Sequence, residues 1–172
     1  MGFHHVAVAT RNLEASHAFY TGPMGFRLVK VVAGKTEGGF SKHLFYETGG
    51  GGLFAIWDLH DATLPEDWKT AISTDLGLPI WTNHIAFDAA DLDDIEARKR
   101  RLLDHGVGVA EVDHGWCTSI YAQDPNGIMV EFCTTTRAFT AADTEEALRL
   151  LADANPPLES PPTPRTPHPA TR

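Results

Sequence analysis

The sequence has few cysteines, no long apolar run and no leader-like start. Its two cysteines, Cys117 and Cys133, form no CxxC pair. Small disulfide-held secreted domains use more cysteines, so we expect reduced thiols in a cytoplasmic protein. No stretch is apolar enough to span a bilayer, and the start lacks the basic-then-apolar order of a signal peptide. The sequence therefore predicts no membrane partner.

Positive charge is also scarce. Lys and Arg number 14 against 23 Asp and Glu, which gives a net charge of -9. This balance argues against nucleic acid and anionic membrane surfaces as partners. The basic run in "EARKRR" (residues 96–101) is predicted to be a solvated helix face. At 172 residues the chain fits one domain, or two half-domains that share a sheet.

The C-terminal region is poor in large apolar residues. Residues 154–172 hold seven of the eleven prolines and cannot bury enough surface to offset the entropy of ordering them, so we predict a disordered tail. The preceding segment, 137–153, contains "DTEEALRLLAD", which predicts a short helix capped by Asp143.

Residues 1–60 predict one strand, one helix and three further strands. The strand "FHHVAVAT" alternates in polarity and is rich in valine. The following helix has Asn12 as a plausible N-cap and Gly22 and Pro23 as a stop. The segments "FRLVKVVA", "SKHLFYE" and "GLFAIWD" supply the three strands. Residues 61–81 then form a linker.

The same order returns in residues 82–136. "NHIAFDA" predicts a strand, and "DLDDIEARKRRLLDHG" predicts a helix with Asp91 as its cap and Gly106 as its stop. The segments "GVAEVDH", "TSIYAQD" and "GIMVEFCTT" complete the second unit. The chain is therefore predicted to contain two copies of a βαβββ module.

Aligning the two units places His5 on His84, Tyr46 on Tyr121 and Ile56 on Glu131. Equivalent residues of duplicated modules converge across a pseudo-two-fold axis. We therefore expect an α+β fold in which two βαβββ modules form a curved mixed sheet around a common site, followed by the C-terminal helix and the proline-rich tail.

The hairpin "TSIYAQDPNGIMVEF" fixes the neighbours of Glu131. Asp-Pro-Asn-Gly suits a type I turn, with Gly127 as the left-handed residue of a three-residue loop. Asp124 then pairs with Ile128, and Tyr121 lies opposite Glu131 on the same face, about 5 Å away between Cβ atoms. Apolar residues alternate on both faces of this strand, so the carboxylate is predicted to be covered and to need a partner.

A metal ion would supply that partner. Two imidazoles, from His5 and His84, together with the Glu131 carboxylate suit a divalent transition metal and leave coordination positions open for other ligands. Ile56, at the fourth equivalent position, cannot bind metal. His4 is predicted to point to the opposite face of the strand from His5 and to serve in packing or at the surface.

The segments "HHVAV", "AFYTGPMGF", "NHIAF" and "YAQDPNGIMVEF" resemble the vicinal oxygen chelate superfamily. This superfamily includes extradiol dioxygenases, glyoxalase I enzymes and the fosfomycin and bleomycin resistance proteins, and the resemblance covers residues 3–135. It implies that His5, His84 and Glu131 bind metal. Glyoxalase I enzymes generally use four protein ligands, so three ligands favour the extradiol pattern.

The extradiol pattern also includes a tyrosine ten residues before the glutamate, which implies a catalytic role for Tyr121. An acid-base histidine precedes that tyrosine, and His114 is its nearest match, although it is closer to Tyr121 than the pattern has it. The resemblance thus implies a ring-cleaving dioxygenase acting on a catechol-like aromatic diol and dioxygen, with Fe(II) as the favoured metal. Mn(II), Zn(II), Ni(II) and Co(II) suit the same ligands.

Two other functions stay open. One is a lyase, isomerase or epimerase in which the metal polarises a carbonyl or an enediolate, and the other is a metal-free binding or resistance protein. The resemblance also implies a homodimer. Several side chains fit either a ligand pocket or ordinary packing: His43, His60, Phe54, Trp57, Trp68 and Trp81.

Overall fold

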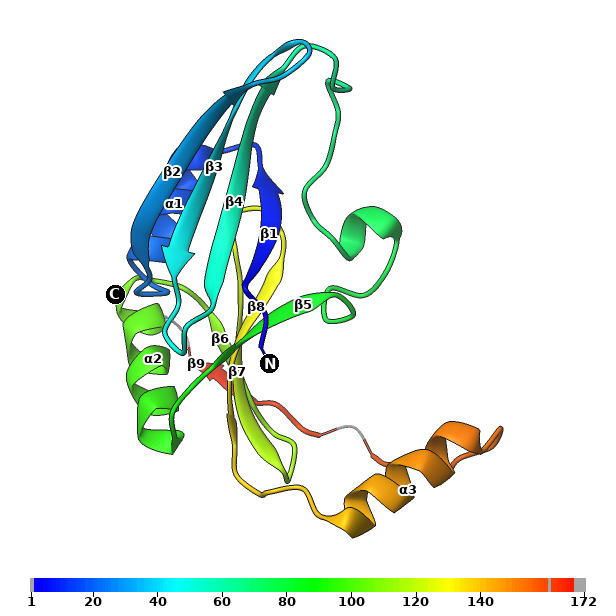
Figure 1. Cartoon of the computed structure of the whole chain (residues 1–172). Coiled ribbons are helices and arrows are strands. Elements are labelled where there is room, and N and C mark those ends of the chain that lie inside the picture. The colour runs from blue at the N-terminus through cyan, green and yellow to red at the C-terminus, as the bar shows by residue number, and fades with distance from the viewer. Residues whose placement is uncertain (1, 161, 169–172) are drawn as a thin grey trace.

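The computed structural model describes residues 2–160 and 162–168. The first module consists of β1 (His5–Thr10), α1 (Leu13–Thr21), β2 (Arg27–Lys35), β3 (Gly39–Glu47) and β4 (Leu53–Asp61). The second consists of β5 (His84–Asp88), α2 (Leu92–Asp104), β6 (Val109–Asp113), β7 (Cys117–Gln123) and β8 (Met129–Thr135). The predicted duplication of a βαβββ unit is confirmed (Figure 1).

Each module builds its own mixed sheet. The strand orders are β1-β4-β3-β2 and β5-β8-β7-β6-β9. The first strand of each module runs parallel to its last strand, and the other neighbours are antiparallel. Within the described part of the chain, the edge strands β1 and β5 do not pair with each other, so the two sheets do not form one continuous sheet. The single curved sheet expected from the sequence would need these two edges to meet.

The first two helices begin where their capping residues predict. The Asn12 side chain accepts a hydrogen bond from the Ala15 backbone N–H at 3.0 Å, and Asp91 accepts one from the Asp94 N–H at 2.9 Å. These bonds satisfy N–H groups that have no partner within the helix.

The third helix, α3 (Ala141–Ala152), begins earlier than the sequence predicts. Its N-cap is Thr140, whose side chain pairs with the Asp143 N–H while the Asp143 carboxylate accepts from the Thr140 N–H. Asp143 is thus the third residue of a capping box and not the cap itself. In Figure 1, α3 projects away from both sheets, and none of its residues is buried.

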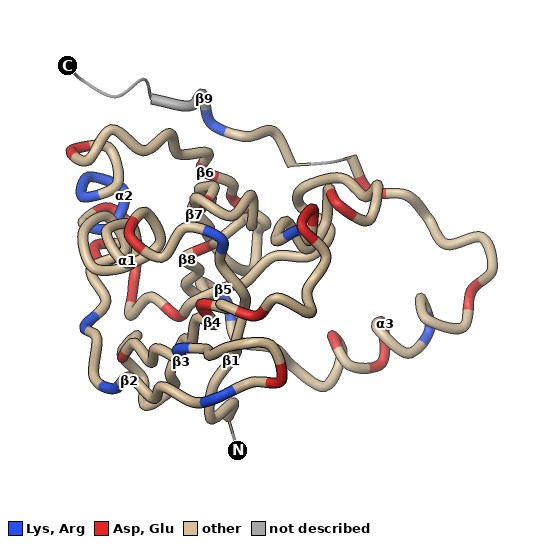
Figure 2. Tube along the Cα trace, turned by 90° about the horizontal axis from the view of Figure 1, so that it is seen from above, with Lys and Arg blue, Asp and Glu red and all other residues tan. Residues whose placement is uncertain are grey.

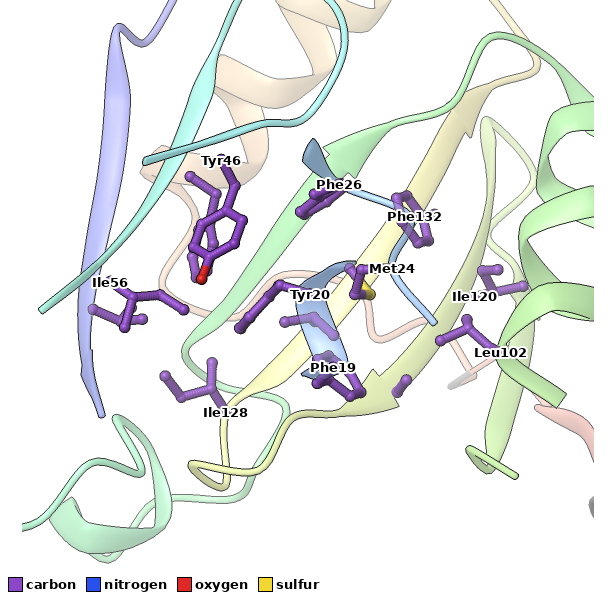
Figure 3. Close-up of a cluster of buried hydrophobic side chains, with 14 of the residues drawn as sticks. Phe19, Tyr20, Met24, Phe26, Tyr46, Ile56, Leu102, Ile120, Ile128 and Phe132 are labelled. Atoms are coloured by element: carbon purple, nitrogen blue, oxygen red, sulfur yellow. The ribbon is translucent and has the colours of Figure 1, made fainter. Parts of the chain in front are cut away.

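The two modules share one hydrophobic core between their helix-covered sheet faces (Figure 3). The ring of Phe26, which follows α1, packs edge-on against Phe87 of β5 with ring centroids 4.8 Å apart. The Tyr20 hydroxyl of α1 donates to the Asp124 carboxylate at 2.8 Å. Because strand side chains alternate between faces, the residues next to these core positions point away from it. Each sheet therefore has an outer face, opposite the shared core.

Part of the proline-rich tail has regular structure. Residues 165–168 form β9 (Arg165–His168), which pairs antiparallel with β6. Arg165 contacts the Glu111 carboxylate at 2.9 Å, and Glu111 also binds Lys99 of α2 at 2.8 Å. Residues 154–160 and 162–164 contain no helix or strand. The predicted disorder is wrong for β9, because an open sheet edge offers backbone partners even to a chain poor in apolar residues.

Charged side chains on α2 are paired. Figure 2 shows acidic and basic residues together on this helix. Arg98 binds Asp94 at 2.9 Å, and Lys99 binds both Glu96 and Glu111. The predicted solvated face is confirmed for Arg100 and Arg101, but the Arg98 and Lys99 side chains are only 19% and 13% exposed, because they pack towards the sheet and its carboxylate Glu111. No helix within 2–160 and 162–168 is long and apolar enough to cross a membrane.

Candidate metal centre

The strand register fixes which residues of the two modules are equivalent. His5 pairs with Leu53 in the first sheet, and His84 pairs with Met129 in the second. His5 and His84 are therefore equivalent, as predicted. Two positions further along, Ala7 lies beside Ala55 and Ala86 lies beside Glu131. Ala55 is therefore the counterpart of Glu131.

The predicted equivalence of Ile56 with Glu131, and of Tyr46 with Tyr121, is wrong by one residue. Phe45 is the counterpart of Tyr121, because it pairs with Ala55 as Tyr121 pairs with Glu131. A one-residue shift moves every side chain to the other face, and Tyr46 and Ile56 are fully buried in the shared core. The conclusion that the first module lacks a counterpart to the Glu131 carboxylate is unchanged, because the side chain of Ala55, like that of Ile56, cannot bind a metal.

The hairpin between β7 and β8 has the predicted geometry. Asp124 donates its backbone N–H to the Ile128 carbonyl at 2.9 Å, Gly127 has a φ of 79°, and Tyr121 pairs with Glu131. The Asp124 carboxylate also accepts the backbone N–H groups of Asn126 and Ile128, both at 2.8 Å. These bonds hold the turn, so Tyr121 and Glu131 are fixed on one face of a rigid ladder.

Two of the three predicted metal ligands, His84 and Glu131, are in contact with each other. The Nε2 atom of His84 lies 3.0 Å from Oε2 of Glu131, whose side chain is only 6 % exposed. His84 Nδ1 donates to the Trp81 carbonyl at 2.9 Å. The bond from Nδ1 to this carbonyl leaves Nε2 as the ring nitrogen that faces the Glu131 carboxylate. A carbonyl that fixes the far nitrogen in this way is typical of metal-binding histidines.

The separation of these two atoms suits a metal ion. Ligand atoms about 2.1 Å from an ion, at right angles to each other, lie about 3.0 Å apart. A divalent cation could therefore bind both atoms without moving either side chain far. The donor set of one imidazole and one carboxylate therefore fits the metal that the sequence analysis expects.

His5 is not part of this pair within one chain. It lies on the outer face of the first sheet, is exposed, and has its Nδ1 atom 2.9 Å from Nδ1 of His4. His4 precedes the first residue of β1, so the alternation that would send it to the other face does not apply. Within residues 2–160 and 162–168, no group of three or more His, Cys, Asp or Glu side chains is placed to hold a metal. The predicted three-ligand site is therefore not assembled in the single chain.

Tyr121 and His114 are brought together beside Glu131. The Nε2 atom of His114 lies 3.0 Å from the Tyr121 hydroxyl oxygen, although seven residues separate them in sequence. Burial, with a smaller contribution from the Glu131 charge, raises the pKa of Tyr121 to about 12. The phenol is therefore a proton donor at neutral pH, and the imidazole is within reach of its proton.

The two cysteines lie on the same two strands, β7 and β8. Both are free thiols, and Cys133 is the cross-strand partner of Ser119. Burial raises the pKa of the Cys133 thiol to about 11, so it is protonated at neutral pH. Cys133 comes two residues after Glu131 on β8, which puts it on the same face of the strand.

The outer face of the first sheet carries a group of aromatic rings. His43 of β3 and Trp57 of β4 are stacked there, and Phe45 contacts both His5 and His43. Two crevices lie elsewhere. One, of about 420 Å³, includes Val6 and Phe87, and the other, of about 600 Å³, includes Asp58, but His5, His84 and Glu131 line neither.

Solved structures share this fold. A protein from an integron gene cassette of the Halifax Harbour sewage outfall is 27% identical with a TM-score of 0.55, covering 77% of this chain and 97% of its own. A lactoylglutathione lyase from Agrobacterium tumefaciens is 21% identical with a TM-score of 0.53, covering 77% and 92%. TnmS3, an antibiotic binding protein from Streptomyces sp. CB03234, is 18% identical with a TM-score of 0.54, covering 79% and 97%.

No curated protein sequence matches the chain at a significant level. A family model does match, over residues 2–132, and it describes a superfamily that contains enzymes as well as binding proteins. The match spans both βαβββ modules and includes His5, His84 and Glu131. The chain belongs to the glyoxalase/bleomycin resistance protein/dioxygenase superfamily.

Proposed function

We propose that this chain is a metal-dependent ring-cleaving dioxygenase of the extradiol type, acting on a catechol-like aromatic diol. The observation that carries the proposal is the 3.0 Å contact between His84 and Glu131, on the same sheet face as Tyr121. Fe(II) is the metal we assign, since one or two imidazoles with a carboxylate suit it. The free thiols of Cys117 and Cys133 agree with a reducing, cytoplasmic setting.

The number of protein ligands supports a dioxygenase over a four-ligand centre. Ala55 occupies the position equivalent to Glu131, so the first module offers only His5. Three protein ligands leave positions for two substrate oxygens and for dioxygen. A bound divalent ion would lower the pKa of the diol and hold it beside dioxygen, and both oxygen atoms would enter the ring-opened product.

Tyr121 and His114 have the arrangement of a proton-transfer pair. The Tyr121 hydroxyl lies beside Glu131 and would donate a hydrogen bond to a substrate oxygen. His114, 3.0 Å from that hydroxyl, would accept a proton from the diol side of the site and return it to the product. Both side chains belong to the second module, so this part of the site is complete within one chain.

A second copy of the chain would supply the missing ligand. His5 and His84 both lie on exposed edge strands, β1 and β5, on the outer faces of their sheets. Setting β1 of one copy beside β5 of the other brings His5 of one chain to His84 and Glu131 of its neighbour. A two-fold dimer then contains two identical sites, because each copy gives one half to each site.

Mixing two inactive variants tests this arrangement. His5→Ala and Glu131→Ala homodimers each lack one ligand in both sites. A mixed dimer keeps one intact site, so random exchange of equal amounts restores about a quarter of the wild-type sites. The matched control mixes His84→Ala with Glu131→Ala, which damage the same half and restore nothing. If the first mixture also restores nothing although exchange is verified, the shared site is wrong.

The reaction itself is tested with protein purified without air and loaded with Fe(II). A panel of catechols should produce oxygen uptake and a yellow ring-fission product, and His84→Ala should abolish both. No uptake with any catechol by the iron-loaded dimer would refute the proposed activity.

Two outcomes would point to the alternative functions. Turnover under nitrogen with tightly bound zinc, nickel or cobalt would indicate a lyase, isomerase or epimerase. Stoichiometric ligand binding by the His5→Ala, His84→Ala double variant would indicate a binding protein that needs no metal.

A further inference from the structure

The outer face of the first sheet carries a stacked pair of rings, His43 and Trp57. The two residues are direct cross-strand partners on β3 and β4. Their ring centroids are 3.7 Å apart and their planes differ by 11°. Nearly parallel rings at this separation lie face to face, so the pair can take a further planar ring only on an outer ring face, at the end of the stack. We call this pair the His43–Trp57 stack.

The stack is continuous with the proposed metal ligand of the same sheet. Phe45 has its ring centroid 4.2 Å from that of His43 and 5.6 Å from that of His5. The centroids of His5 and His43 are 6.1 Å apart. A row of neighbouring rings therefore leads from His5 through Phe45 and His43 to Trp57.

Core packing does not account for these rings. The shared core is built from the other face of the sheet, where Phe54 and Ile56 are fully buried on either side of Ala55. His43 and Trp57 are only partly buried and do not belong to that core. Partly covered aromatic surface on a sheet face is what a ligand or a second chain would cover.

The equivalent positions in the second module carry no rings. Ser119 is the counterpart of His43, and Cys133 is the counterpart of Trp57, because the two pairs occupy the same places in their ladders. The duplicated faces have therefore diverged. The second sheet carries the carboxylate and the proton-transfer pair, whereas the first sheet carries His5 and the broad aromatic surface.

We infer that the His43–Trp57 stack binds the planar ring of the substrate and selects aromatic ligands over aliphatic ones. The inference rests on the proposed function, because the second copy places this surface opposite His84 and Glu131. A flat ring lying on the stack keeps its two oxygens on the side of His5. An aliphatic 2-hydroxy acid can offer the same two oxygens but has no ring to stack.

The test compares two ligands that chelate alike but differ in aromaticity. Naphthalene-2,3-diol and lactate are titrated anaerobically, by calorimetry, into the metal-loaded wild type and the Trp57→Leu and His43→Leu variants. We expect each variant to lose about tenfold in affinity for the naphthalenediol. The affinity for lactate and the metal content should stay unchanged.

Trp116→Leu is the matched control. Trp116 is also partly exposed, but it packs against Phe139, outside the row of rings. It should keep the wild-type preference for the aromatic ligand. Thermal unfolding of each variant separates a local loss of binding from a loss of fold.

Each outcome bears on the inference. Unchanged naphthalenediol affinity in Trp57→Leu and His43→Leu, or a wild type without aromatic preference, would overturn it. An equal loss of affinity for both ligands in a folded variant would also overturn the inference, because stacking affects only the ligand that has a ring. If the wild type binds the naphthalenediol through Trp57 but cleaves no catechol, the dioxygenase activity fails while the stack keeps its assigned role.

Discussion

His84 and Glu131 lie on neighbouring parallel strands, and their side chains meet although Glu131 is not the direct partner of His84. Glu131 pairs with Ala86, two residues beyond His84, and His84 Nε2 still reaches Glu131 Oε2 at 3.0 Å. A small residue at position 86 leaves the space in which the imidazole leans along the strand. The contact is therefore produced by sheet register and by one alanine.

Replacing Glu131 with glutamine should weaken metal binding. The amide keeps the size of the side chain but removes the charge that a cation needs, so we expect the affinity for Mn(II) or Fe(II) to fall about a hundredfold. Anaerobic competition with a coloured chelator measures this. Glu47→Gln, which changes an exposed carboxylate paired with Arg27, is the control and should bind metal normally. Equal affinity in both variants would remove Glu131 from the ligand set.

Acid should release the metal, because a metal-bound imidazole must give up its proton. In the wild type, protons and metal compete for His84 Nε2 and Glu131, so the measured affinity should fall as the pH is lowered from 8 to 5. The released protons can be counted by calorimetry in buffers of different ionisation enthalpy. Binding that is independent of pH would contradict ligation by these two groups.

Tyr121→Phe and His114→Ala should each reduce catechol turnover by about a hundredfold while leaving metal content unchanged. Because the hydroxyl and the imidazole are 3.0 Å apart, they should act as one unit. The double variant should then be scarcely slower than either single variant. Oxygen uptake at saturating catechol measures all three, and multiplicative losses would mean that the two groups act independently.

Alkaline pH should destabilise the fold through Tyr20. Burial, with the adjacent Asp124 charge, raises its pKa well above the ordinary value. The stabilisation that the neutral Tyr20 hydroxyl gives the fold is fully present below about pH 10, the pKa of tyrosine in the unfolded chain. It is lost as the pH rises from there towards the higher pKa of Tyr20 in the folded protein. The free energy of unfolding should fall by about 1.4 kcal/mol per pH unit from this residue.

Urea unfolding between pH 8 and 11.5 measures that slope, and Tyr20→Phe should flatten it. At pH 8 the free energy of unfolding of the variant should be about 1.5–3 kcal/mol lower than that of the wild type, because the hydrogen bond to the Asp124 carboxylate is lost. An identical pH slope in both proteins would show that Tyr20 is not the titrating group.

Phe26→Ala should destabilise both modules together. The ring packs against Phe87 and Phe132 of the second module, so its removal leaves a cavity in the shared core. We expect a cost of about 3–5 kcal/mol and a single unfolding transition. Phe139→Ala, at a ring that is 62% exposed, should cost under about 0.5 kcal/mol. Two separate transitions would mean that the modules fold independently.

The sequence predicts those parts of the fold that depend on near neighbours. Asn12 and Asp91 cap their helices, and the Asp-Pro-Asn-Gly turn sets Tyr121 opposite Glu131, because each depends on a few consecutive residues. The α3 cap was misplaced for a local reason too. Asp143 resembles a cap, but Thr140, three residues earlier, competes for the same N–H groups and forms the box.

The alignment of the modules failed where residue identity misled it. Matching Tyr46 to Tyr121, and the glycines of the two loops, set the first module one residue out of register. In the structure Glu47 pairs with Leu53 and Gln123 pairs with Met129, and five residues lie between the two members of each pair. The pairing of the strands therefore identifies Ala55 as the counterpart of Glu131 and Phe45 as the counterpart of Tyr121. Matching single residues between the two modules could not reveal this register.

The meeting of His5 with the other ligands depends on how sheets pack. Duplication predicts equivalent positions but does not say whether two modules associate by their edges or by their helix-covered faces. In this chain Phe26, Phe87 and Tyr20 bring the helix-covered faces together, which leaves both histidines on outer faces. Which faces of the two modules associate depends on hydrophobic burial over the whole core, so it cannot be predicted from a short stretch of sequence.

The short strand β9 has a consequence for how copies of this chain can join. It occupies the far margin of the second sheet, next to β6, and contains Pro167, which has no amide hydrogen to offer to an incoming strand. Strand-by-strand growth is therefore blocked on that side. β5, the strand that carries His84, is left as the margin of this sheet that is open to a neighbour, and it is the margin that the proposed dimer uses.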